Sequence, residues 1–145
     1  MNRKKNILII VSNYYQDISD NLIEETKKVI EENNILYQIE TVTGVFEIPS
    51  IVSFSKHNFD GYIALGCVIR GETSHYDYVC KESANALMSL SLEGLAIGYG
   101  ILTVENYSQA LARIKTDKEK MGKGKVAALA CINQIKLKIK YTNGS

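Results

Sequence analysis

The sequence is poor in the residues that mark disordered chains, disulfide scaffolds and zinc sites. It has 1 proline, 3 cysteines and 2 histidines among 145 residues, and no tryptophan. Cys67, Cys80 and Cys131 are scattered and form no C-x-x-C pair. A disulfide framework needs an even set of cysteines, and a zinc site needs short paired spacings. We therefore expect free thiols in a reducing compartment, and no metal.

The sequence also lacks a strong net charge and a long apolar run. Its formal net charge of +1 gives no electrostatic reason to expect nucleic acid or a membrane surface as a partner. The lysine-rich start contains only the short apolar run "ILIIV", which is followed by polar residues and not by a cleavage site. No stretch approaches the roughly 18 to 20 apolar residues that span a bilayer. We expect a cytoplasmic protein.

What the sequence does contain is the composition of one folded domain. Hydrophobic residues make up 46% and charged residues 23% of the chain, which is ordinary for a folded protein. A chain of 145 residues can bury one sizeable core but not comfortably two. We predict a single domain over residues 1–145, with a basic N-terminal tail at residues 1–6 and a C-terminal tail at residues 140–145.

Apolar runs alternate with helix-period patterns along the chain, which distinguishes expected strands from expected helices. We expect strands at residues 7–11, 35–42, 60–69 and 95–103. We expect helices at residues 18–33, 49–54, 76–92, 107–115 and 124–139, the first of them capped by Ser19 or Asp20. The strand at residues 60–69 is the most apolar and should be central. Alternation of this kind predicts an α/β fold, a three-layer α/β/α sandwich with a four-stranded parallel sheet and helices on both faces.

The carboxyl ends of the strands should gather the residues that carry chemistry, because ligands of such sheets bind there. The four strand ends are followed by "YY" at 14–15, "GVFE" at 44–47, "RGETSH" at 70–75, and Tyr99 with Thr103. Nearly all the aromatic and polar residues that could build a site therefore lie at one edge of the sheet.

The segment "GETSH" leads into the expected third helix. Ser74 can cap that helix, and free N–H groups at a helix N-terminus favour an anion such as phosphate. The helix dipole disfavours the charged form of His75, and a neutral imidazole can accept a proton. The residues fit equally well a capped helix start with a surface histidine.

Other candidates have a structural and a functional interpretation. Glu47 suits the first turn of a helix, and could also bind hydroxyl or amine donors. Tyr14, Phe46 and Tyr99 could be core residues, or could stack on a flat ring. Arg113 and Lys123 are most simply solvated.

Three motifs occur in order along the chain: "GVFEIP", "GCVIRGETSHYDYVC" and "YGILTVENYSQALAR". With them the sequence resembles the 6,7-dimethyl-8-ribityllumazine synthase family over about residues 7–139. The resemblance implies a flavodoxin-like fold and the penultimate step of riboflavin biosynthesis. In that step 5-amino-6-(D-ribitylamino)uracil condenses with 3,4-dihydroxy-2-butanone 4-phosphate, releasing phosphate and water without a cofactor.

The resemblance also implies a role for each matching residue. Tyr14 would stack on the pyrimidine, and His75 would be the general acid and base. The substrate-binding positions implied by the match are Val45, Phe46, Glu47, Cys67, Val68, Ile69 and Tyr99, with Glu47 on the ribityl hydroxyls. The phosphate-binding positions implied are Glu72, Thr73, Arg113 and Lys123. In this family Tyr99 and Arg113 are donated by a neighbouring subunit, so the resemblance implies a homo-oligomer with sites between subunits.

The sequence departs from the family pattern at a few points. Tyr15 stands where this family commonly has asparagine. The linker from Arg113 to Lys123 is slightly longer than in shell-forming members, and the segment before the first strand is short. Both features favour a free pentamer over an icosahedral shell. Riboflavin synthase is a further partner to test. The alternative to an enzyme is a non-catalytic module of flavodoxin-like fold, for flavin or phosphate binding or for assembly, in which His75 would be dispensable.

Overall fold

A computed structural model of the chain describes residues 3–71, 76–114 and 120–142. The described residues form a parallel sheet of four strands in the order β2-β1-β3-β4. The strands are β1 (Asn6–Ser12), β2 (Leu36–Val42), β3 (Gly61–Ile69) and β4 (Ile97–Val104). Every residue of β3 is buried, which confirms its predicted place inside the sheet, whereas β2 is an edge strand with mostly exposed residues.

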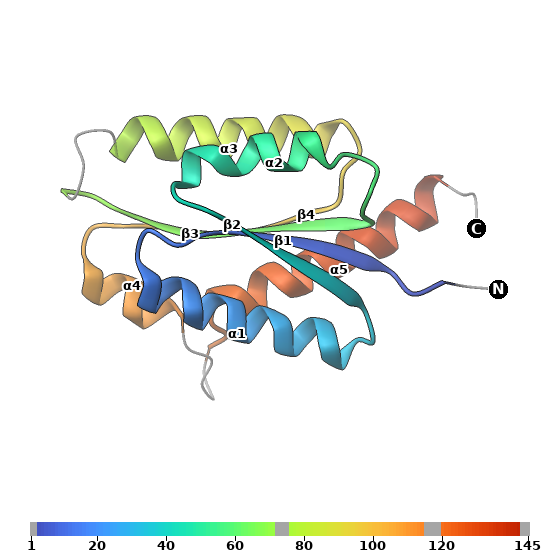
Figure 1. The fold of residues 1–145 in the computed structure, drawn as a ribbon, viewed down its shortest axis with the longest axis horizontal. Helices are drawn as coiled ribbons and strands as arrows, with labels where there is room; N and C mark the ends of the chain where they lie inside the picture. Colours follow the sequence, from blue (N-terminus) through green and yellow to red (C-terminus); the bar gives the residue numbers. More distant parts are fainter. Residues whose placement is uncertain (1–2, 72–75, 115–119, 143–145) are drawn as a thin grey trace.

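Two layers of helices cover the sheet (Figure 1). The helices are α1 (Gln16–Glu32), α2 (Ile48–Phe54), α3 (Tyr76–Leu92), α4 (Tyr107–Arg113) and α5 (Lys123–Thr142), and a 3-10 turn, η1 (Val45–Glu47), precedes α2. Helices α2 and α3 lie on one face, and α1, α4 and α5 on the other (Figure 1). The three-layer α/β/α, flavodoxin-like fold is thereby confirmed.

The sheet divides the core into two apolar clusters. In β1, Ile7, Ile9 and Val11 belong to the cluster beneath α1, α4 and α5, and Leu8 and Ile10 belong to the cluster beneath α2 and α3. This follows from the two-residue period of a strand, which sends successive side chains to opposite faces. Burial on both faces explains why β1 and β3 read as continuous apolar runs.

A close contact between α5 and β4 positions the start of α5. A β-carbon at Gly98 would collide with the carbonyl oxygen of Ala127, and one at Gly100 would lie 2.9 Å from the Ala127 side chain. Glycine at these two positions therefore lets α5 pack directly on the strand backbone. The consequence is that the first residues of α5 lie beside the middle of β4.

The predicted cap of the first helix is wrong. Helix α1 begins at Gln16, two residues earlier than predicted, and its N-cap is Tyr15, whose side chain makes no capping hydrogen bond to the helix. Ser19 lies inside the first turn, where its hydroxyl donates to the Gln16 carbonyl at 3.0 Å, and Asp20 accepts from the Gln16 side chain at 2.7 Å. Both side chains are thus too far along the helix to reach its free N–H groups.

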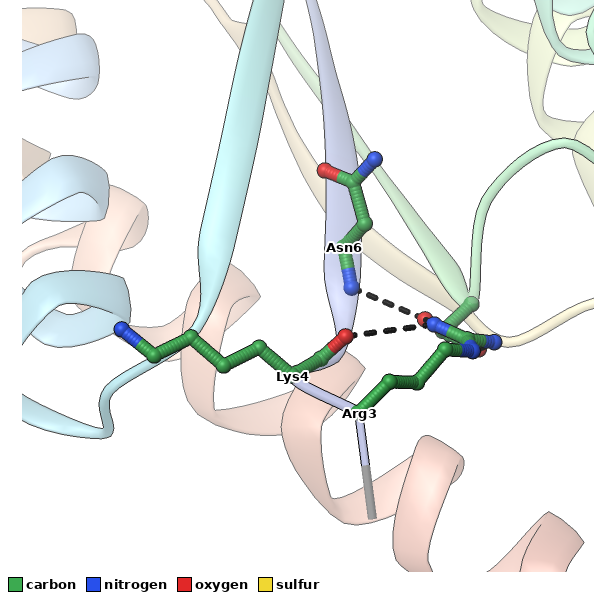
Figure 2. A network of polar contacts seen from close by, with 4 residues as sticks. Arg3, Lys4 and Asn6 are labelled. Carbon is green, nitrogen blue, oxygen red and sulfur yellow. Dashed lines mark hydrogen bonds and ion pairs between the residues drawn. The ribbon is translucent and has the colours of Figure 1, made fainter. Parts of the chain in front are cut away.

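The two predicted tails are shorter than expected. Asn6 already belongs to β1, and its backbone N–H donates to Asp60 at 2.8 Å. Both terminal nitrogens of Arg3 donate to the same carboxylate, at 2.7 and 2.8 Å, and one also reaches the Lys4 carbonyl at 3.2 Å. Figure 2 shows Arg3, Lys4 and Asn6 of this network. At the other end, α5 continues through Thr142.

Candidate functional site

Two separate hollows hold most of the predicted site residues. The first has a volume of about 180 Å³ and lies at the carboxyl ends of β1 and β3. Its lining residues include five predicted positions: Tyr14, Val45, Cys67, Val68 and Ile69. None of the side chains that line it in the described part of the chain carries a formal charge at neutral pH. We call it the ring hollow, because an uncharged, largely apolar recess suits a flat heterocycle.

Tyr14 and Cys67 differ in how they face the ring hollow. The Tyr14 side chain is 64% exposed, and its ring meets the Tyr15 ring edge to face at a centroid distance of 4.9 Å. A further ring can therefore stack on its open side. Cys67 is buried, and burial raises the pKa of its thiol to about 11. A thiol with this pKa is neutral at physiological pH, which favours the interpretation of Cys67 as a filler over that of a nucleophile.

The turn η1 carries Phe46 and Glu47 beside the ring hollow, which Val45 of the same turn lines. Phe46 is 49% exposed and stacks on Tyr78 of α3 at a centroid distance of 6.2 Å. The Glu47 carboxylate accepts from the Gly44 backbone N–H at 3.0 Å and lies at the surface. One carboxylate oxygen is thus committed to the turn, while lone pairs remain for hydroxyl donors.

The second hollow has a volume of about 360 Å³ and lies along β4, the open edge of the sheet. It brings together three predicted residues from three elements: Tyr99 of β4, Arg113 of α4 and Lys123 of α5. Lys120 also lines it, and none of the described residues that line it is acidic. We call it the cationic hollow. The three positive charges of Arg113, Lys120 and Lys123 suit a phosphate dianion.

Local contacts hold the cationic hollow in shape. The Lys123 ammonium lies 5.7 Å from the centre of the Tyr99 ring, and burial raises the pKa of that tyrosine. The close approach of α5 to Gly98 brings Lys123 to this place. Arg113 donates back to the Gln109 carbonyl at 3.2 Å and remains exposed, so its guanidinium can turn toward a ligand.

The remaining predicted residues, Glu72, Thr73 and His75, lie outside the described residues. The chain on either side of them is described. Gly71 follows β3 with φ of +86°, a left-handed conformation that favours glycine. Tyr76 begins α3, and the Arg70 guanidinium lies 4.4 Å from the centre of its ring.

Some residues of these hollows were not predicted. Ser12 lines the ring hollow, where its buried hydroxyl donates to the Thr43 carbonyl at 2.9 Å and ties the end of β1 to the turn after β2. Lys120 donates to the Ala112 carbonyl at the end of α4. Ser12 is a polar residue at the end of an apolar run, and this position could have marked it as a site residue. Lys120 stands in a lysine-rich linker, and its spacing offered no such signal.

The part of the chain that the structure describes contains no group of three or more His, Cys, Asp or Glu residues that could hold a metal ion. Within the same ranges, no helix is both long and apolar enough to cross a membrane.

Comparison with known proteins decides the family. The family model of 6,7-dimethyl-8-ribityllumazine synthase matches residues 4–138. The chain belongs to the 6,7-dimethyl-8-ribityllumazine synthase family. Three relatives of that name are each 44% identical to it. The Bartonella henselae protein aligns over 144 residues, which cover 96% of this chain and 92% of the relative. The Agrobacterium fabrum protein aligns over 146 residues (94% and 97%), and the Zymomonas mobilis protein over 137 residues (93% and 97%).

Membership of the lumazine synthase family agrees with the resemblance drawn from the three motifs. The family match spans both hollows, from β1 through α5. It favours the enzyme over the alternative of a binding or assembly module.

Proposed function

We propose that this chain is a lumazine synthase. It condenses 5-amino-6-(D-ribitylamino)uracil with 3,4-dihydroxy-2-butanone 4-phosphate, releases phosphate and water, and needs no cofactor. The observation that carries the proposal is the pair of hollows, one shaped for a ring and one charged for a phosphate, in a chain of this family.

The ring hollow takes the ribitylaminouracil. Tyr14 stacks on the pyrimidine, and the backbone of Cys67, Val68 and Ile69 at the end of β3 reads its polar edge. Val45, Phe46 and Glu47 hold the ribityl chain, with Glu47 accepting from its hydroxyl groups. The exposed carboxylate of Glu47 and the open face of Tyr14 support these roles.

The phosphate of the second substrate binds between the segment after β3 and the cationic hollow. Thr73 and Glu72 belong to that segment, and Arg113 provides the bidentate charge that a phosphate dianion favours. Lys123 adds a point charge, and Tyr99 packs against it. The three positive charges among the described lining residues support this assignment, because they attract the phosphate.

His75 acts as the general acid and base. The amine of the ribitylaminouracil attacks the ketone carbon of the second substrate, and water leaves as the imine forms. His75 then moves protons during elimination of phosphate and closure of the ring, in which the ribityl-bearing nitrogen attacks the remaining carbonyl carbon and a second water leaves. Much of the remaining rate acceleration comes from holding the two substrates together, because a bimolecular encounter becomes effectively intramolecular.

Each active site is shared between two copies of the chain. The ring hollow and the cationic hollow have no lining residue in common, and the cationic hollow lies along the open edge of β4. A second copy that approaches this edge would receive Tyr99, Arg113 and Lys123. The assembly is a homopentamer in the cytoplasm, with riboflavin synthase as a further partner. A mass near one megadalton in light scattering would contradict a free pentamer.

The test is to mix the purified protein with both substrates and follow the absorbance of the lumazine product. We expect product formation that slows about tenfold or more in His75→Ala, which loses the proton relay. A folded, oligomeric wild type that makes no product above the uncatalysed background would overturn the proposal and favour a non-catalytic binding module.

A further inference from the structure

The Arg70 side chain joins three segments of the chain at the carboxyl edge of the sheet. Its Nε donates to Glu105 Oε2 at 3.0 Å, and its Nη2 lies 3.4 Å from Asp77 Oδ1. Its guanidinium carbon lies 4.4 Å from the centre of the Tyr76 ring. Arg70 directly follows β3, Glu105 directly follows β4, and Tyr76 and Asp77 begin α3.

The partners of Arg70 are themselves held in place. The Glu105 backbone N–H donates to the Gln109 side chain at 2.7 Å, and this ties the acceptor to the first turn of α4. Tyr76 packs against the apolar cluster beneath α2 and α3, and its hydroxyl forms a hydrogen bond with Thr103 of β4. The Arg70 backbone N–H donates to the Val104 carbonyl at 2.8 Å. Two of the residues that Arg70 contacts, Tyr76 and Glu105, therefore have further contacts of their own to neighbouring elements.

The contacts of Arg70 orient the segments that they join more than they stabilise the fold. The side chains of Arg70, Glu105 and Asp77 are 49%, 56% and 82% exposed, and exposed ion pairs stabilise a fold very little. A planar guanidinium can nevertheless use its edge for carboxylates and its face for a ring at the same time. Lysine has one point charge and cannot reproduce both contacts.

Five residues, from Gly71 to His75, connect Arg70 to Tyr76. The Arg70 contacts fix both ends of this connection, because Arg70 is one end and Tyr76 is the other. A catalytic group loses rate steeply when it is misplaced, so the elements on either side of it matter for the rate.

We propose that Arg70 is a positioning residue for the reaction. By tying Tyr76 and Asp77 to the ends of β3 and β4, it holds the start of α3, which directly follows the residues proposed to bind phosphate and to transfer protons. The inference rests on the proposed function, which gives those two residues their roles.

The chain offers a matched control for a purely structural role. Lys56 and Glu93 form an ion pair of 2.8 Å, with side chains 34% and 53% exposed, between the segments that follow α2 and α3. This pair lies at the opposite end of α3 from Arg70 and touches neither hollow. Loss of either pair should cost similar, small stability, so the two can be compared directly.

The kinetic test compares Arg70→Met, Arg70→Lys and Lys56→Met. We expect Arg70→Met to lower kcat about tenfold and to raise the KM for the phosphorylated substrate about fivefold. The KM for ribitylaminouracil should stay within about twofold, because Tyr14, Val45 and Glu47 belong to other segments. Arg70→Lys should restore only part of the loss, and Lys56→Met should change neither parameter.

Hydrogen exchange at residues 80–83 tests the contact without substrates. These amides depend on the first turn of α3, so they should exchange several-fold faster in Arg70→Met and at the wild-type rate in Lys56→Met. Equal kinetics and equal exchange in the two variants would overturn the inference. A wild type without turnover would overturn the proposed function, and exchange alone would then decide whether Arg70 holds the start of α3.

Discussion

The two hollows differ in chemistry and in where they lie in the sheet. The ring hollow lies at the ends of the interior strands β1 and β3, and the described residues that line it carry no charged side chain. The cationic hollow lies along the edge strand β4 and is lined by Arg113, Lys120 and Lys123. An apolar recess can be completed within one chain, since both neighbouring strands of an interior position are present. An edge strand leaves one side open, where a second copy can approach.

This difference means that neither hollow alone fits both proposed substrates. The ring hollow could bind the heterocycle but has no cation for a phosphate, and the cationic hollow could bind phosphate but has Tyr99 as its one aromatic lining residue. If the two hollows are halves of one site, a variant in the ring hollow should weaken binding of ribitylaminouracil. A variant in the cationic hollow should weaken binding of the phosphorylated substrate.

The largest expected effect comes from the cationic hollow. Arg113→Ala should lower kcat/KM for the phosphorylated substrate roughly 100-fold, because a bidentate, charge-assisted contact is lost. The control is Lys125→Ala, which removes one positive charge from the start of α5, two residues from Lys123 but outside the hollow. Steady-state kinetics on both variants check this. Equal, small losses of kcat/KM in both variants would mean that only the total positive charge matters, and that the position of Arg113 in the cationic hollow does not.

A smaller effect is expected in the ring hollow. Tyr14→Ala should raise the KM for ribitylaminouracil about tenfold, because the stacking surface is lost. Inhibition by inorganic phosphate should be unchanged, since its site lies elsewhere. Tyr14→Phe keeps the ring and should behave like the wild type. Weakened phosphate inhibition in Tyr14→Ala would break the division between the hollows.

The contacts of Asp60, which directly precedes β3 at the amino ends of the strands, should affect stability but not activity. Asp60→Asn removes the carboxylate that accepts from Arg3 and Asn6, and we expect a loss of about 1 kcal/mol in the free energy of unfolding. The hydrogen bond from Arg3 lowers the pKa of Asp60. Its contribution is therefore present above the unfolded-state pKa and disappears as the pH falls through the lower folded-state value.

Urea unfolding of wild type and Asp60→Asn at pH 7 and at acidic pH checks that sign. The difference in the free energy of unfolding between the two proteins should shrink toward low pH. A difference that grows on acidification, or a fall in kcat at pH 7, would contradict the assignment.

The smallest effect is expected at Cys67. Cys67→Ala should change kcat less than about twofold, since a thiol with a pKa of about 11 is neutral and unreactive at pH 7. Alkylation by iodoacetamide should modify the partly exposed Cys80 first, with Cys67 and Cys131 following only at strongly alkaline pH. Peptide mass spectrometry measures the order. Rapid loss of activity through alkylation of Cys67 at pH 7 would exclude the filler role.

The elements with strong local patterns could be predicted from the sequence. The apolar run of β3 and the helical period of α3 predicted both elements to within one residue at each end. The place of the ring hollow could be predicted as well, because the carboxyl ends of parallel strands lie at one edge of the sheet. The start of α1 was missed, since Tyr15 precedes it without a side-chain cap and so leaves no capping signal.

Contacts between distant segments could not be predicted. Lys123 reaches Tyr99 because Gly98 and Gly100 let α5 approach β4, and no local pattern encodes that approach. Arg70 and Glu105 are 35 residues apart, and only the pairing of β3 with β4 brings them together. Residues 72–75 were predicted to contribute to the site and stay a prediction.

The central claim is that the two hollows form one site between two copies of the chain, and a mixing experiment tests it most directly. Tyr14→Ala and Arg113→Ala chains are unfolded together in equal amounts, refolded and assayed. Each mixed assembly would contain sites with an intact ring hollow from one copy and an intact cationic hollow from its neighbour. About a quarter of the sites should be fully intact. With both substrates well below their KM values, where each parent variant keeps about a tenth of the wild-type activity or less, the activity of the mixture should therefore rise to about a quarter of the wild-type value. Activity that stays at the mean of the two parent variants would contradict a shared site.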